Sequence, residues 1–214
     1  MGKKKKEEKH VYHNAEGKIV PSVTTIIGIL NKPEIVTWAN MLGFKHIKHE
    51  EFLNVRAAIG TDFHKMVEDY TSGKEVSGEH YKESIEMFER FCTWAKCHYY
   101  KVLLHEQTLV CDSFGGTLDA VAEFEGHLSL VDYKTSAKIY PSQFVQLAGY
   151  AVLLKQLMPE TYEKIEMFGI VSMRYPQSHK FISKKKMEKK FIPVFEKALQ
   201  LYDSWDRILE DTYW

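Results

Sequence analysis

The sequence predicts a single α/β domain with a mixed sheet flanked by helices, N-terminal helical additions and a long C-terminal helix. Three observations lead to this prediction. A chain of 214 residues has the length of one domain and is too short for two of ordinary size. Apolar residues recur at three- and four-residue steps in several long segments, as amphipathic helices require. Three shorter, strand-like segments between them are separated only by glycine-containing turns.

The chain is expected to open with a basic tail and a short hairpin, which together take up residues 1–20. Val11 to His13 and Lys18 to Val20 flank a turn that ends at Gly17. The domain itself is expected to span residues 21–214.

A short helix is expected to begin the domain. Ser22 or Thr24 is its expected N-cap, because each has a side-chain oxygen and precedes a run of apolar residues that stops before Pro33. The N–H groups at a helix start also suit a phosphate. Ser22 and Thr24 are therefore candidates both for simple capping and for nucleic-acid binding.

The remaining elements follow from periodicity and turn signals. In chain order they are helices at about Glu50–Tyr70 and His80–Tyr100, antiparallel strands at Leu103–Cys111, Thr117–Phe124 and Leu128–Lys134, a helix that begins at Pro141, a strand at Met167–Met173 and a helix at about Met187–Leu209. The last helix is expected to bury one apolar face, made of Phe191, Val194, Phe195, Ala198, Leu201, Tyr202 and Trp205.

The composition is that of an ordinary globular protein. With 44% hydrophobic and 27% charged residues, disordered, collagenous and disulfide-scaffold chains are excluded. No apolar stretch approaches the roughly 18 residues that cross a bilayer, so no membrane partner is expected. The basic start runs into Glu7 and Glu8 instead of an apolar segment, so we expect a cytoplasmic protein that is not secreted.

Charge and cysteine content narrow the class further. Lys+Arg and Asp+Glu number 29 each, so net charge gives no argument for nucleic acid. Two local lysine runs, Lys3–Lys6 and Lys184–Lys190, could contact phosphates or could be a solvated tail and a solvated helix start. The three cysteines (Cys92, Cys97, Cys111) form no C-x-x-C pair, which fits a reducing compartment.

An acid and an amine end the third predicted strand. Because strand side chains alternate, Asp132 and Lys134 leave the same face two residues apart. Acid-x-Lys patterns occur elsewhere in the chain, but this one alone follows a strand with a buried pattern.

A second carboxylate, Asp119, lies on the preceding strand just after two glycines. An unpaired carboxylate in an otherwise apolar strand is costly, so a partner is expected. Two carboxylates near Lys134 are typical of a magnesium site, although a structural ion pair is the alternative. Glu106, on the first strand, is either an additional acid or an ordinary strand-edge glutamate.

Side chains on two helices complete the candidate site. Gln146 and Tyr150 are four residues apart, so they share a helix face from which they could reach a phosphate or hold Lys134. His64 lies one turn after Gly60, where its imidazole could join a metal site. A lone helical histidine is otherwise a polar surface or core residue.

Four short patterns occur in one order, namely G-x-x-x-H at Gly60–His64, G-x-x-D at Gly116–Asp119, D-x-K at Asp132–Lys134 and Q-x-x-x-Y at Gln146–Tyr150. This series resembles the RecB-like branch of the PD-(D/E)XK nucleases, whose restriction-endonuclease-like core has the order α-β-β-β-α-β. The segment that begins at Pro21 is also similar to mitochondrial genome maintenance exonucleases and related phage exonucleases. The resemblance covers about residues 20–173 and implies one nuclease domain within residues 21–214.

The resemblance implies roles for these residues. His64, Asp119, Asp132 and the backbone carbonyl of Tyr133 would hold Mg²⁺ or Mn²⁺, and Lys134 would orient or activate the attacking water. Gln146 and Tyr150 would position the scissile strand or the lysine. Some related nucleases hold an iron–sulfur cluster with four cysteines. This chain has three, badly spaced, so no cluster is expected.

The expected function is that of a metal-dependent DNA nuclease, most simply an exonuclease on single-stranded or free-ended DNA in replication, recombination or repair. Such a protein would work in the cytoplasm, at the nucleoid or in a phage-infected host. The alternative is a catalytically weak DNA-binding or scaffolding subunit with a recombination or replication protein as partner, which the zero net charge favours. A third hypothesis is an enzyme for other phosphate esters. Trp38, Tyr99, Tyr100 and Tyr175 are ordinarily core or packing residues, and their alternative role is base stacking.

Overall fold

A five-stranded mixed sheet forms the centre of the protein, in a computed structural model that describes residues 11–30 and 33–212. The strand order is β3-β4-β5-β6-β7. The strands are β3 (Lys101–Val110), β4 (Gly115–Phe124), β5 (His127–Lys134), β6 (Met167–Ser172) and β7 (Ser178–Ser183). A separate two-stranded hairpin consists of β1 (Tyr12–His13) and β2 (Ile19–Val20).

The sheet contains one parallel strand pair, β5 with β6, and its other pairs are antiparallel. Strands β3, β4 and β5 form an antiparallel meander, as the glycine turns predicted. Two helices, α5 (Pro141–Leu157) and α6 (Pro159–Lys164), then return the chain so that β6 pairs parallel to β5. Strand β7 closes the far edge antiparallel to β6. The carboxyl ends of β5 and β6 therefore meet at one edge of the sheet.

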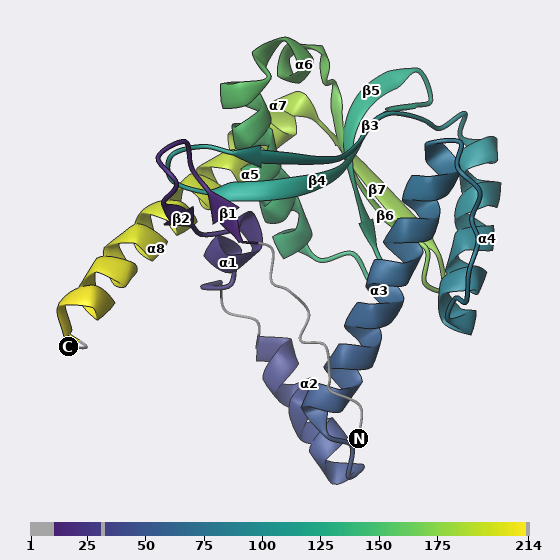
Figure 1. The fold of residues 1–214 in the computed structure, drawn as a ribbon, viewed down its shortest axis with the longest axis horizontal. Helices are drawn as coiled ribbons and strands as arrows, with labels where there is room; N and C mark the ends of the chain where they lie inside the picture. Colours follow the sequence, from purple (N-terminus) through teal and green to yellow (C-terminus); the bar gives the residue numbers. More distant parts are fainter. Residues whose placement is uncertain (1–10, 31–32, 213–214) are drawn as a thin grey trace.

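Helices cover both faces of the sheet (Figure 1). One core contains apolar residues of α5 together with α1 (Val23–Ile27) and α8 (Ile192–Thr212). The other core lies under α3 (His49–Thr71) and α4 (Lys82–Cys97). Gly149 of α5 is needed here, because a Cβ at this position would lie 2.6 Å from Val23 Cγ1 and 2.7 Å from the Phe195 ring.

Three elements were not anticipated from the sequence. Helix α2 starts at Pro33, which we expected only to end the preceding helix, and runs to Phe44. Proline suits the first position of a helix, where its missing N–H needs no partner. Strand β7 is an edge strand in which three of six residues are exposed and one, Ile182, is buried, so its sequence carries little alternation. The short helix α6 begins at Pro159, directly after α5.

The prediction for the last helix was partly wrong. The chain forms a short turn α7 (Lys184–Lys186) and a π-helical segment η1 (Met187–Phe191) before α8. Phe195 and Ala198 are buried as expected, but Val194 is 41% exposed, and in the second half of α8 Leu201 and Trp205 are 59% and 56% exposed. The reason is that α8 runs beyond the sheet it packs on (Figure 1), so its second half has no core beneath it.

No helix in the described part of the chain is long and apolar enough to span a membrane. The lysines of the run Lys184–Lys190 are mostly exposed, although Lys184 donates to the Tyr162 and Glu163 carbonyls. The other run, Lys3–Lys6, lies outside the described residues.

Candidate metal centre

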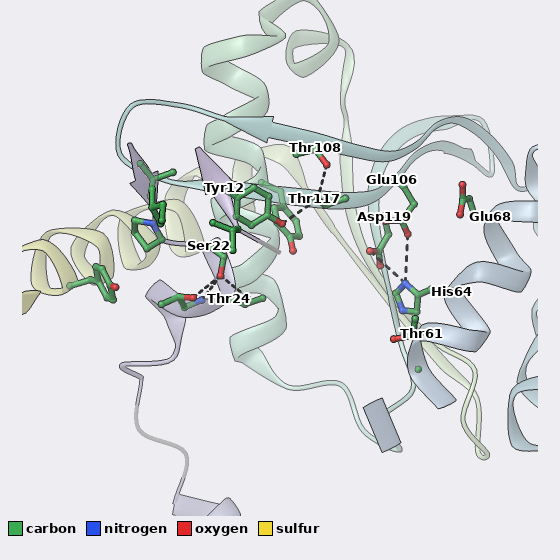
Figure 2. Close-up of a pocket in the computed structure, with 18 of the residues that line it drawn as sticks. Tyr12, Ser22, Thr24, Thr61, His64, Glu68, Glu106, Thr108, Thr117 and Asp119 are labelled. Carbon is green, nitrogen blue, oxygen red and sulfur yellow. Dashed lines mark hydrogen bonds and ion pairs between the residues drawn. The ribbon is translucent and has the colours of Figure 1, made fainter. Parts of the chain in front are cut away.

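His64, Glu106 and Asp119 converge at one end of a cleft of about 1120 Å³ (Figure 2). They come from α3, β3 and β4 respectively, and one ligand atom from each lies within 4.8 Å of the others. His64 Nδ1 is 3.7 Å from Asp119 Oδ1 and 4.0 Å from Glu106 Oε1. The structure thus brings the predicted His64 and Asp119 together and adds Glu106, which the sequence left open.

The backbone at Glu106 is unusual, with a φ of 40° inside a strand. Non-glycine residues in this left-handed region are uncommon, and such strain clusters at functional sites. No sequence pattern signals this conformation, which is why Glu106 was ambiguous beforehand.

Asp132 and Lys134 lie side by side, as their spacing on β5 predicted. Lys134 Nζ is 2.7 Å from Asp132 Oδ2. The Asp132 side chain is 1% exposed, and its Oδ1 has no hydrogen-bond partner among the described residues. The contact with Lys134 is therefore an ion pair that leaves the carboxylate with unused lone pairs in a buried position, a costly state unless another ligand satisfies them.

A chain of hydrogen bonds leads from Lys134 into α5. Lys134 Nζ donates to Gln146 Oε1 over 3.0 Å, and Gln146 Nε2 donates to the Tyr150 hydroxyl over 2.8 Å. Gln146 and Tyr150 were predicted either to reach a phosphate or to hold Lys134. In the structure Gln146 holds Lys134, and Tyr150 in turn contacts Gln146. Gln146 fixes the ammonium in position beside Asp132.

Glycine at one motif position, Gly116, allows this approach. A Cβ on Gly116 would lie 2.7 Å from the Tyr150 ring, so only glycine lets β4 pass so close to α5. Gly60 lies against Thr135, the residue after Lys134, with a virtual Cβ contact of 3.6 Å to its Oγ1. Gly116 thus lies against Tyr150 of the Q-x-x-x-Y pattern, and Gly60 lies against Thr135, which directly follows the D-x-K pattern.

Tyr133 links the two carboxylate strands. Its backbone N–H donates to Asp119 Oδ2 over 2.7 Å, and its hydroxyl pairs with that of Tyr100 at 2.7 Å. The hydrogen bond from the Tyr133 N–H gives the buried Asp119 carboxylate a partner that carries no charge, so the carboxylate keeps its negative charge. Tyr100, one of the candidate stacking residues, is therefore engaged in packing.

All three carboxyl groups resist ionisation in the absence of a cation. Burial raises the pKa of Asp119 to about 6 against the charge of Lys134, and burial together with the nearby Asp119 raises the pKa of Asp132 to about 6. Burial and the charge of Asp119 raise the pKa of Glu106 to about 7. Such crowding of acids is what a bound cation relieves.

The two basic groups shift in opposite directions. Burial and the charge of Lys134 lower the pKa of His64 to about 4, so its imidazole is neutral and able to ligate. Burial opposes the charge of Lys134, but the attraction of Asp132 and Asp119 prevails and raises its pKa. The lysine is therefore an ammonium at neutral pH.

These residues fit a hard divalent cation. Carboxylate oxygens with one imidazole suit Mg²⁺ or Mn²⁺ better than soft metals, which prefer thiolates. The buried Oδ1 of Asp132, which has no partner among the described residues, could accept a further ligand. His64, Glu106 and Asp119 are close enough together to hold the ion, and Asp132, whose charge acts on His64, would be a further ligand.

The far end of the cleft is lined by hydroxyl groups (Figure 2). Ser22 Oγ accepts from the Thr25 N–H over 2.9 Å, which makes Ser22 the N-cap of α1, and it lies 2.8 Å from Thr24 Oγ1. Thr117 Oγ1 lies 3.2 Å from the Tyr12 hydroxyl. Binding of nucleic acid by Ser22 and Thr24 stays a prediction.

Tyr12 and Thr117 were not singled out from the sequence. The glycine pair Gly115–Gly116 was the one sequence signal. In the structure a Cβ on Gly115 would lie 2.7 Å from the Tyr12 ring. A pair of glycines beside a strand indicates close packing but does not say against which residue. The other aromatic candidates divide as follows: Trp38 packs against His49 and Phe52, whereas Tyr99 and Tyr175 are 84% and 80% exposed.

Comparison with known proteins adds little to this picture. No protein-family model matches the chain, and no curated protein is similar to it. A solved structure, that of SSO0001, is similar with 14% sequence identity over 55% of this chain and a TM-score of 0.33. The matched part covers 58% of the SSO0001 chain.

Proposed function

We propose that the protein is a metal-dependent DNA nuclease with a restriction-endonuclease-like core of the PD-(D/E)XK type. The observation that carries the proposal is the series of contacts that joins four sequence patterns, each on a different element. Asp119 lies 3.7 Å from His64 and accepts from the Tyr133 N–H. Asp132 is close enough to both for the charges to act on one another, and Lys134 lies beside Asp132, held by Gln146. The element order from α4 to β6 is consistent with such a core.

The chain's own residues divide the work. A bound Mg²⁺ or Mn²⁺ would lower the pKa of a water molecule and offset the charge that develops on the phosphate. Lys134 presents an ammonium that can hold the attacking water in line, and Gln146 limits its movement. Asp132 keeps this ammonium charged. Burial of the carboxylates excludes bulk water from the reacting groups.

The cleft itself suggests the substrate. Of the described residues that line it, Lys65 is the one lysine or arginine, and it is paired with Glu68 and Asp69. Asp206 adds a further acid to the lining. Without a cation the cleft would repel phosphates, so binding is expected to depend on the metal. Hydroxyl and tyrosine groups favour a single strand or a frayed end over a rigid duplex.

A second candidate is a DNA-binding or scaffolding subunit that keeps the fold but turns over slowly, working beside a recombination or replication protein. The zero net charge favours it. Tight DNA binding in EDTA, with no turnover in any metal, would support this candidate.

The test compares cleavage of a labelled oligonucleotide by wild-type protein and by Lys134→Met and Asp132→Asn. Glu123→Gln is the matched control, because Glu123 is an exposed acid on the same strand as Asp119. We expect both site variants to lose at least about 100-fold in rate, on the scale of one general-acid, general-base or electrostatic contribution, and the control to keep full activity. Activity that persists in both site variants would rule out this function for the site.

A further inference from the structure

Arginine is used very selectively in this chain. The sequence contains four arginines among 29 basic residues, and the other 25 are lysines. Three of the four, Arg56, Arg90 and Arg174, gather around one carboxylate, Glu83. Because arginine differs from lysine mainly in its planar, forked donors, such concentration at one place points to recognition of a planar or tetrahedral oxyanion.

Two of these arginines have structural partners. Arg56 Nη1 donates to both oxygens of Glu83, at 2.6 and 2.7 Å, and so ties α3 to α4. Arg90 Nε donates to the Met173 carbonyl over 2.7 Å and ties α4 to the end of β6. Simple scaffolding accounts for both.

Scaffolding does not account for Arg174. Its Nε lies 3.7 Å from Glu83 Oε1, beyond hydrogen-bonding distance, and it makes no hydrogen bond to the described residues. Its side chain is 38% exposed. Three positive charges face one carboxylate, and that carboxylate is already occupied by Arg56, so the forked donors of Arg174 remain available to a ligand.

The cluster lies next to the metal centre. Ser172, the last residue of β6, pairs with Lys134, and the Met173 N–H donates to the Lys134 carbonyl over 3.3 Å. Arg174 lies two residues beyond Ser172, so its Cα is at most about 7 Å further along the chain. Arg56 Nη2 reaches the carbonyl of Thr135, the residue after Lys134, at 3.4 Å.

We propose that Arg174, supported by the Arg56–Glu83 pair, binds a phosphate group of the nucleic-acid strand. This phosphate neighbours the phosphate that is cleaved in the same strand. The inference rests on the proposed function and extends it to residues that do not line the cleft. Tyr175, 80% exposed and next in the chain, would stack on the neighbouring base. The phosphate can be a strand terminus or an internal diester, and the two sources differ in charge.

The test is binding of fluorescent oligonucleotides in Ca²⁺, followed by anisotropy, with a 5′-phosphate, a 3′-phosphate or hydroxyls at both ends. Arg174→Gln is expected to weaken binding roughly tenfold, the order for one charge-assisted contact. Arg207→Gln, which alters the fourth arginine, exposed on α8, is the control and should stay within about twofold, as for a single exposed charge. Thermal unfolding of Arg174→Gln should stay close to wild type, since this half-exposed side chain contributes one long ion pair to Glu83 and no hydrogen bond to the described residues.

The outcomes separate the two proposals. A loss confined to one phosphorylated end identifies a terminal phosphate, and an equal loss for all three oligonucleotides identifies an internal one. Binding by Arg174→Gln that equals wild type for every oligonucleotide overturns the phosphate site while leaving the nuclease proposal intact. A wild-type protein that neither binds nor cleaves DNA in Mn²⁺ overturns both.

Discussion

Replacing Asp119 by asparagine should stabilise the metal-free protein. Its carboxyl group has a pKa of about 6 in the fold, raised chiefly by burial, against 3.8 without the fold. A difference of about two in pKa corresponds to about 3 kcal/mol of unfolding free energy. Asparagine keeps an oxygen to accept the Tyr133 N–H but carries no charge to bury. Because Lys134 loses a neighbouring anion, the net gain should be about 1 to 3 kcal/mol.

The pH dependence follows from the sign of the shift. A carboxyl group whose folded pKa is raised stabilises the fold most at low pH, and this stability is lost as the pH rises from 3.8 to about 6. The advantage of Asp119→Asn should therefore be full at pH 7.5, where that loss is complete, and small near pH 4. Urea unfolding in EDTA at these two values measures it.

The control is the same substitution at Asp62, another acid of the α3 region. Burial there is outweighed by hydrogen bonds from His80 and the Tyr81 N–H, so the pKa of Asp62 is lowered. Asp62→Asn should therefore destabilise the protein at pH 7.5. If Asp119→Asn is also less stable than wild type in EDTA, the burial argument for the metal centre is refuted.

Two further predictions concern stability away from the site. Gly149→Ala should cost about 1 to 3 kcal/mol in thermal unfolding, because the new methyl group overlaps Val23 and Phe195. The control Gly43→Ala lies in open space on α2 and should raise stability by up to about 1 kcal/mol. Equal effects of the two substitutions would contradict the packing described. His179 accepts a hydrogen bond from Trp94 Nε1, and burial followed by the charge of His98 lowers its pKa below 6.5. Stability should therefore fall as the pH drops below about 6.5, and His179→Gln should reduce that fall in urea unfolding at pH 7.5 and 5.5; an unchanged fall would exclude His179 as its source.

Local patterns predicted the parts of the site that depend on local geometry. Strand alternation brought Asp132 and Lys134 to one face, and helical spacing placed Gln146 and Tyr150 together. Both relations involve residues within four positions of each other. At such short separations the periodicity of the backbone decides which side chains lie on the same face.

Features that depend on distant contacts were not predictable. The gathering of Arg56, Glu83 and Arg174 joins residues of α3, α4 and the end of β6, and no spacing signals it. The exposed half of α8 was expected to be buried because periodicity gives the direction of an apolar face but not the extent of the sheet beneath it. Trp205 shows the difference most clearly.

The most direct test of the central claim is the time course of Mn²⁺-dependent cleavage of DNA labelled at either end. The account predicts products that appear in Mg²⁺ or Mn²⁺, disappear in EDTA, and shorten progressively from one labelled end. Cleavage that persists in EDTA, or no cleavage in either metal with DNA still bound, would contradict it.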